Sequence, residues 1–216
     1  MRRIGLLGGT FDPVHFGHLR PAVEVRAALA LDELRLLPCR VSPLRDEPAA
    51  TAADRVEMLR LALAGQDDLV LDPRELERPP PSYTADTLAE LRAEAPDARL
   101  HFIMGADAFA GFGRWARTDE ILQLAHLVVT RRPGVALETP PALAGRVSEE
   151  PADLERAASG RVLLLSVTQL DISASAIRRL AAAGGDLRYL LPEPARDYLE
   201  RNRLYRDASK GERRTG

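Results

Sequence analysis

The sequence has almost no cysteine, a single lysine and no long hydrophobic run. Cys39 is the only cysteine, so an intramolecular disulfide and a multi-cysteine metal site are excluded, and we expect a small buried side chain rather than a nucleophile. Lys210 is the only lysine, so arginine must supply the cationic contacts of any phosphate site. Glycines and Asp12 interrupt the N-terminal apolar stretch, unlike a signal peptide, and no run could span a membrane. We therefore expect a cytoplasmic protein.

A large excess of charge of either sign is also absent. The formal net charge of the 216 residues is -2, so no general field draws the chain to nucleic acid or to an anionic membrane. We expect neither as a partner, and any phosphate site must be built locally. The sequence does not indicate the oligomeric state.

Short apolar runs alternate with helical patterns along the chain, which is typical of a parallel sheet covered on both faces. We expect an α/β fold, a Rossmann-like doubly wound parallel sheet with a small C-terminal helical portion. Residues 1–206 are expected to form a single domain and 207–216 a disordered tail. The predicted strands are 4–7, 34–38, 69–71, 100–104, 126–130 and 161–167.

Helices are predicted between these strands, the first of them over about 18–30. Thr51, with Asp54 three residues later, forms a capping box for the second. Ser82 or Thr84 is expected to cap the next, and Ser173 a helix that ends near residue 183. Pro192 is expected to open a C-terminal helix. Residues 39–50 are predicted to be an exposed loop, and 133–160 a connection of uncertain helix content.

The segment between the first strand and the first helix, residues 8–18, reads Gly-Gly-Thr-Phe-Asp-Pro-Val-His-Phe-Gly-His. Its glycines let the backbone approach a phosphate, and the following helix presents free N–H groups. His15 and His18 could both face one anion, donating hydrogen bonds and carrying positive charge near neutral pH. Two histidines at this spacing are more often surface or capping residues, and a zinc pair would need a third ligand that is not nearby.

This segment resembles the signature of the nucleotidyltransferase superfamily that shares a His-x-Gly-His element with class I aminoacyl-tRNA synthetases. Other segments are similar to the nicotinate-mononucleotide adenylyltransferases of bacteria. Residues 81–88 read Pro-Ser-Tyr-Thr-Ala-Asp-Thr-Leu, and Gly-Ala-Asp at 105–107 precedes Trp115. Residues 171–178 read Asp-Ile-Ser-Ala-Ser-Ala-Ile-Arg, and 189–192 and 204–205 match the family's ending. The resemblance runs from about residue 3 to residue 205.

The resemblance implies adenylyl transfer from ATP to nicotinate mononucleotide, giving deamido-NAD and pyrophosphate in NAD biosynthesis, with Mg²⁺ bound through the ATP phosphates and no metal held by the protein. It assigns catalysis to His15, His18 and Arg178. The implied ATP-binding residues are Gly8, Gly9, Thr10, Phe11, Gly105, Asp107, Ser175, Ile177 and Arg178. The implied residues for the mononucleotide are Tyr83, Thr84, Ala85, Trp115 and Arg45. His101 and His126 receive no role.

Two departures from the family pattern and several alternatives stay open. Residues 43–45 read Pro-Leu-Arg where the family often has Pro-His-Lys, and Ala174 replaces a serine. Trp115 could be a core residue, Thr84 only a helix cap, and Arg178 a solvated residue on an amphipathic helix. A pantetheine-phosphate adenylyltransferase and a nucleotide-binding regulatory protein without turnover are the rival functions. The serine-tyrosine-threonine element and Trp115 disfavour the first, and the retained histidines with Arg178 disfavour the second.

Overall fold

The computed structural model describes residues 1–41, 47–132, 134 and 137–206. The predicted site residue Arg45 lies outside the described residues, as do the rest of residues 42–46 of the predicted 39–50 loop and the predicted tail at 207–216. In the described part, no helix is long and apolar enough to cross a membrane.

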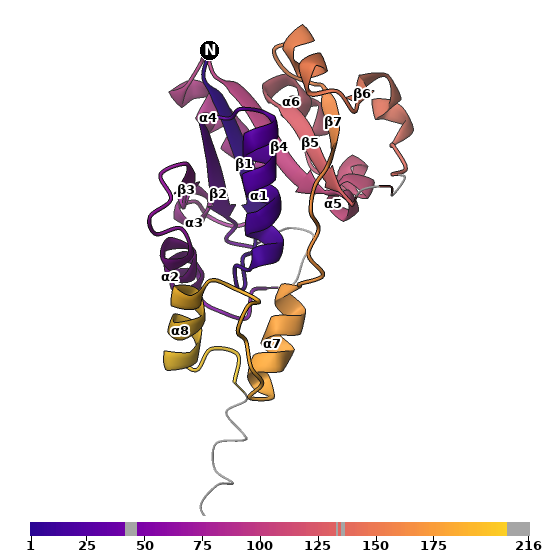
Figure 1. The fold of residues 1–216 in the computed structure, drawn as a ribbon. Helices are drawn as coiled ribbons and strands as arrows, with labels where there is room; N and C mark the ends of the chain where they lie inside the picture. The colour runs from indigo at the N-terminus through magenta and orange to yellow at the C-terminus, as the bar shows by residue number, and fades with distance from the viewer. Residues whose placement is uncertain (42–46, 133, 135–136, 207–216) are drawn as a thin grey trace, which may run out of the picture.

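A single parallel sheet of seven strands runs through the described chain, in the order β3-β2-β1-β4-β5-β7-β6 (Figure 1). All six strands predicted from the sequence are present, and β6 is a two-residue addition inside the 133–160 connection. The chain moves outward in one direction from β1 through β2 to β3, and in the other through β4, β5 and β7, so the sheet is doubly wound as predicted. The strand bounds are Arg3–Gly9 (β1), Glu33–Pro38 (β2), Leu69–Leu71 (β3), Arg99–Gly105 (β4), His126–Arg131 (β5), Val147–Ser148 (β6) and Val162–Ser166 (β7).

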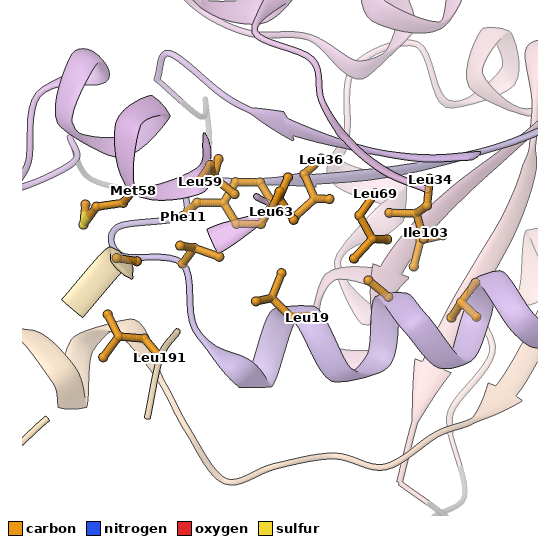
Figure 2. Packing of buried hydrophobic residues seen from close by; sticks show 14 of the residues in the cluster. Phe11, Leu19, Leu34, Leu36, Met58, Leu59, Leu63, Leu69, Ile103 and Leu191 are labelled. Carbon is orange, nitrogen blue, oxygen red and sulfur yellow. The ribbon is translucent and has the colours of Figure 1, made fainter. Parts of the chain in front are cut away.

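Successive residues of the central strands face opposite sides of the sheet and so feed two separate cores. In β4, Phe102 and Met104 enter one hydrophobic cluster, whereas Ile103 enters the other. Figure 2 shows Ile103 next to Leu34 of β2, with Leu19 on the helix that faces the strands. The cluster of Ile103 is closed by α1 (Phe16–Ala28) and α2 (Ala52–Ala62), and the cluster of Phe102 by α4 (Thr84–Glu94), α5 (Ala106–Ala110) and α6 (Thr118–Leu124).

The C-terminal helices lie beyond the carboxyl ends of the strands rather than over the sheet (Figure 1). Helix α8 (Glu193–Arg201) packs against α2, and α7 (Ala174–Ala182) stands beside it. The predicted small C-terminal helical portion is therefore present, and it sits at the end of the sheet where open α/β folds bind ligands. The remaining short helices are α3 (Arg74–Glu77), η1 (Phe112–Arg114), η2 (Pro141–Arg146) and η3 (Pro151–Arg156).

The predicted caps are confirmed at two helices and wrong at a third. Thr51 accepts from the Asp54 N–H at the start of α2, and Ser173 accepts from the Ala176 N–H at the start of α7. Helix α4 has Tyr83 at its N-cap and no side-chain cap, because the Ser82 hydroxyl instead accepts from the Arg40 N–H at 3.0 Å and Thr84 is already helical.

The first helix begins two residues earlier than predicted. Its N-cap is His15, whose carbonyl oxygen accepts from the His18 N–H at 2.9 Å. The glycine at 17 therefore lies inside the first turn, where sequence reasoning placed a loop. Both histidines are consequently carried by the helix N-terminus itself.

Candidate active site

A cleft of about 1120 Å³ opens at the carboxyl ends of β1 and β4. Its walls are the turn after β1, the turn after β4, the start of α4 and the start of α7. The segments that contribute to it are far apart in sequence and meet because parallel strands end at one edge of the sheet. Most predicted site residues line it, namely Gly8, Gly9, Thr10, Phe11, His15, His18, Thr84, Gly105, Asp107, Trp115, Ser175 and Arg178.

Among the predicted residues that the structure describes, three do not line the cleft. Ala85 and Ile177 are buried in the two hydrophobic clusters, so only their backbone could reach a ligand. The Tyr83 ring lies under the guanidinium of Arg117, with Cζ 5.7 Å from the ring centroid. Arg117 is in turn paired with Asp86 at 2.6 Å.

The two histidines stack on each other at the N-terminus of α1. Their ring centroids are 3.8 Å apart with an interplanar angle of 29°, and Phe11 packs edge-on against His18 at 5.1 Å. Helix α1 has no acidic residue in its first turn and no side-chain cap, so the partial positive charge of its N-terminus lies at the cleft. Two of its first N–H groups are already used, since Phe16 donates to the Leu190 carbonyl oxygen at 3.1 Å and His18 to that of His15. The pair therefore stands where a bound anion would gain from imidazole donors and from the helix dipole together.

Gly17 makes this stacking sterically possible. A Cβ atom at this position would lie 2.9 Å from two atoms of the His15 ring and 2.9 Å from the carbonyl oxygen of Ile172. Both distances are shorter than real Cβ contacts, and the carbonyl belongs to backbone that cannot swing aside. The glycine of the His-x-Gly-His element thus lets α1 approach the segment before α7.

Burial changes the charge expected for His15. Only 4% of the residue is exposed, and desolvation lowers the pKa of His15 from 6.5 to about 4. The expectation that both imidazoles carry positive charge near neutral pH therefore fails for His15 in the ligand-free protein, because the charged ring would lose its hydration. Nδ1 of His15 is buried and has no hydrogen-bond partner within the described ranges, so the neutral ring keeps a polar atom unsatisfied.

Arg178 reaches the cleft from the second turn of α7. Its Nη1 donates to the main-chain oxygen of Asp12 at 2.6 Å, and its Nη2 donates to the Ser175 hydroxyl at 3.4 Å. Its side chain is 32% exposed, so part of the guanidinium faces solvent in the cleft. The arginine is therefore oriented by neutral acceptors on two sides and can still offer donors to an anion.

Sequence reasoning missed two buried charged residues beneath the turn after β1. Asp12 is 3% exposed and Arg55 is 1% exposed. Arg55 comes from α2 and donates to the carbonyl oxygens of Thr10 at 2.7 Å and Cys39 at 2.8 Å, so it ties together the turns after β1 and β2. One signal was available, because Arg55 stands three and four residues before Met58 and Leu59 and so shares their core-facing side of the helix.

The opposite end of the cleft is formed by the start of α4 and by Trp115. Trp115 is half-buried, with its ring 5.9 Å from Phe102 and 5.6 Å from Phe112. Since α4 has no side-chain cap, the N–H groups of its first turn are left for a ligand. Glu75 also lines this end, and burial raises the pKa of its carboxyl group while the Thr87 hydroxyl donates to it at 2.8 Å. The sequence pattern did not single out Glu75.

Within the described residues, no group of three histidine, cysteine, aspartate or glutamate side chains could hold a metal ion. His101 and His126, which received no role, lie away from the cleft in the first residues of β4 and β5. Cys39 is buried, as expected, with its Sγ 3.8 Å from the Thr10 hydroxyl oxygen.

Comparisons with known proteins agree with this architecture. The family model described as cytidylyltransferase-like matches residues 6–180. A protein of Halorhodospira halophila named "Probable nicotinate-nucleotide adenylyltransferase" is 51% identical over 200 residues, covering 91% of this chain and 92% of that protein. A protein of the same name from Aeromonas hydrophila is 47% identical over 209 residues, covering 95% of this chain and 98% of its own length.

Among solved structures, the nicotinic acid mononucleotide adenylyltransferase of Plasmodium falciparum, complexed with NaAD, superposes with a TM-score of 0.72. The alignment covers 95% of this chain and 98% of that one at 16% sequence identity. At this identity the superposition supports the fold alone.

Proposed function

The chain belongs to the cytidylyltransferase-like family and, within it, to the nicotinate-nucleotide adenylyltransferases, and from that premise we infer its reaction. It transfers the adenylyl group of ATP to nicotinate mononucleotide, giving nicotinate adenine dinucleotide and pyrophosphate in NAD biosynthesis. The observation that carries this assignment is the stacked histidine pair on an uncapped helix N-terminus, beside Arg178, in a cleft at the strand ends. The cleft volume, about 1120 Å³, is above the range of about 300–1000 Å³ usual for one drug-sized ligand, which suits two nucleotides.

The ATP phosphates are proposed to lie against the turn after β1. Gly8, Gly9 and Thr10 offer close backbone approach, while His15, His18 and Arg178 surround the position of the departing pyrophosphate. Ser175 stands at the start of α7 and holds one edge of Arg178. The adenosine is proposed to lie at the end of β4, where Gly105 leaves open space and the exposed carboxylate of Asp107 can accept from ribose hydroxyls. The remaining members of the proposed ATP set are Phe11, which packs on His18, and the backbone of Ile177.

The chemistry is an in-line displacement at the α-phosphorus of ATP. A phosphate oxygen of the mononucleotide forms the new P–O bond, and the bond from the α-phosphorus to the bridging oxygen of pyrophosphate breaks. The attacking phosphate is already ionised, so no general base is needed and no residue is covalently modified. Catalysis then consists of alignment and of donors aimed at the charge that grows on the leaving group. An anion beside His15 also favours a protonated imidazole, which opposes the desolvation that lowers its pKa to about 4 in the free protein.

Mg²⁺ is proposed to enter with ATP as part of the substrate. It prefers oxygen ligands and is usually held by substrate phosphates with few protein groups.

The nicotinate ring is proposed to stack on Trp115, with its carboxylate at the start of α4. Tyr83, Thr84 and Ala85 supply backbone there, and the N–H groups of this uncapped turn are suitable donors to a carboxylate. Thr87 and Ser82 both hydrogen-bond to Glu75, which supports this segment from beneath. Arg45, outside the described residues, stays a prediction for the phosphate of the mononucleotide.

We place the whole reaction in one domain, residues 1–206, because the last described turn contacts the turn after β1. The hydroxyl of Tyr205 donates to Asp12 at 2.6 Å. This contact supports a single unit that includes both the sheet and the C-terminal portion.

The proposed function is tested with a substrate panel. ATP is offered with nicotinate mononucleotide, nicotinamide mononucleotide or phosphopantetheine, and pyrophosphate release is measured. We expect kcat/KM to be about ten- to a hundredfold higher for the acid than for the amide, because the carboxamide turns an N–H toward a backbone donor and leaves that donor unmatched. Equal values for acid and amide would refute this account of the pocket. If phosphopantetheine were the one acceptor that supports turnover with ATP, the chain would be a pantetheine-phosphate adenylyltransferase. If no acceptor supported turnover, a nucleotide-binding regulatory protein would be favoured.

A further inference from the structure

The carboxylate of Asp12 joins four separate parts of the molecule at the wall of the cleft. Its Oδ1 accepts from the Ala50 N–H at 3.1 Å and from the Tyr205 hydroxyl at 2.6 Å, and its Oδ2 accepts from the Ala49 N–H at 2.7 Å. Arg178 is the fourth partner, from α7. A side chain in the turn after β1 is thereby bound to the end of the β2–α2 connection, to α7 and to the last described turn of the chain.

The contact between Asp12 and Arg178 is looser than a strong ion pair. The distance from Nη1 of Arg178 to Oδ2 of Asp12 is 3.6 Å, whereas a charge-assisted hydrogen bond is about 2.7–2.9 Å long. Nη1 is directed instead at the main-chain oxygen of Asp12, at 2.6 Å. The carboxylate therefore lies beside the guanidinium without forming a short, charge-assisted hydrogen bond to it.

A buried carboxylate next to a phosphate site is unfavourable unless its charge is well solvated by donors. It repels the incoming phosphates, and it competes with them for the same arginine. Here two backbone N–H groups and one phenol occupy three of its about four lone-pair sites. Burial and the adjacent carboxylate both raise the pKa of Tyr205, so the phenol keeps its proton and stays a donor.

We propose that Tyr205 is a positioning residue for adenylyl transfer, which by donating to Asp12 keeps that carboxylate from capturing Arg178 and so leaves the arginine to the ATP phosphates. This inference rests on the proposed function, since it assigns Arg178 to ATP. Tyr205 itself touches no reacting atom. It acts through Asp12, although the two residues are separated by 193 positions in the chain.

The chain offers a closely matched control for this role. Tyr198 also donates its hydroxyl to an aspartate, Asp54 Oδ1 at 2.9 Å, and also ties the C-terminal portion to the N-terminal half. Asp54 belongs to the cap of α2 and does not line the cleft. A purely structural effect of losing a tyrosine–aspartate hydrogen bond should therefore occur in both Tyr198→Phe and Tyr205→Phe, and be larger in the second because burial is the main cause of the raised pKa of Tyr205 but not of Tyr198. Only an effect specific to Tyr205 should fall selectively on KM for ATP.

The test is steady-state kinetics of the wild type, Tyr205→Phe and Tyr198→Phe on the full chain, with each substrate varied in turn. We expect Tyr205→Phe to raise KM for ATP about tenfold, the order expected when one hydrogen bond to a charged group is lost, and to leave KM for nicotinate mononucleotide near the wild-type value. Tyr198→Phe should leave both KM values unchanged. Merely structural damage would lower the active fraction, and so kcat, without changing KM for ATP selectively.

A double-mutant comparison tests the route through Asp12. In an Asp12→Asn background the competing charge is gone, so adding Tyr205→Phe should change KM for ATP by less than about twofold. An unchanged KM for ATP in Tyr205→Phe, or a full effect in the Asp12→Asn background, would overturn the inference while the wild type stays active. An inactive wild type would overturn the proposed function and this inference with it.

Discussion

Four histidines form two pairs of neighbouring rings at opposite ends of the sheet. His15 and His18 stack at 3.8 Å where β1 ends, whereas His101 and His126 face each other across β4 and β5 at 5.5 Å where those strands begin. Burial lowers the pKa to about 4 for His15, His101 and His126 alike. A lowered histidine pKa therefore does not distinguish a residue of the candidate site from a residue of the core in this protein.

The pairs differ in what surrounds them. The His15–His18 pair lines a cleft that Arg178 also lines, and it stands on a helix N-terminus without a side-chain cap. The His101–His126 pair lies within the sheet, and Nδ1 of His126 accepts from the Arg161 N–H at 3.2 Å. Position at the carboxyl edge and access to a ligand thus distinguish the proposed functional pair from the buried pair, and the predictions below test that distinction.

The largest effect is expected for His18→Ala. The variant loses a donor aimed at charge that develops in the transition state, and such donors contribute about 10²–10³ in rate. The loss should fall on kcat, with a smaller change in KM for ATP. Pyrophosphate release and thermal melting of the purified variant are measured together. Near-normal turnover would remove His18 from the mechanism, and a collapsed melting transition would identify a structural histidine instead.

The matched change in the other pair, His126→Asn, should leave kcat and both KM values near wild type. Asparagine keeps an acceptor near the Nδ1 position for the Arg161 N–H. A loss of turnover comparable to that of His18→Ala in a folded His126→Asn protein would abolish the distinction between the pairs.

A smaller but still large effect is expected for Gly17→Ala. The added Cβ would meet the His15 ring and the Ile172 oxygen at 2.9 Å, so α1 and the segment before α7 must separate. Misplacement of this kind costs on the order of ten- to a hundredfold in kcat/KM. Gly145→Ala is the control, since a Cβ at Gly145 meets no described atom within 4 Å. Equal activities of the two variants would show that the close approach at Gly17 is not needed.

A further effect concerns the stability of the folded chain against pH. The folded-state pKa of His126 lies near 4, below the unfolded value of 6.5, so as pH falls the unfolded chain takes up the proton first. The free energy of unfolding therefore decreases between pH 6.5 and about 4, by ~1.4 kcal/mol per pH unit for each such histidine. His126→Asn should flatten the slope measured by urea unfolding by that amount. An unchanged slope would contradict a neutral, buried His126.

The features that could be predicted from the sequence are those that depend on residues close together in the chain. Strands were found because each is a short apolar run, and Thr51 and Ser173 were identified as caps because a cap and its partner lie within three residues. The cap of α4 was wrong because the Ser82 hydroxyl is occupied by Arg40, a contact across 42 positions. Hydrogen bonds between residues a few positions apart can be predicted from the sequence. A distant residue that takes the same side chain as its partner cannot be predicted in this way.

The candidate site shows the same division. The glycine and histidine segment and the start of α7 stood out as patterns, and the structure brings them together in one cleft. The supporting residues Arg55, Asp12 and Tyr205 did not stand out as a group, because their partners are tens to hundreds of positions away. One indication was present in the sequence, because Arg55 occupies a core-facing position of its helix, but the pattern did not indicate which groups Arg55 contacts.

The most direct test of the central claim is a histidine titration by NMR, following the imidazole signals of the full chain with and without ATP. Without ATP, the pKa values of His15, His101 and His126 should all lie near 4. When ATP is added in the absence of any mononucleotide, the signals of His15 and His18 should shift and the pKa of His15 should rise, because the phosphates favour the charged ring. The signals of His101 and His126 should stay where they were. A response of the buried pair to ATP, or none from His15 and His18, would contradict the assignment of the ATP site to the turn after β1.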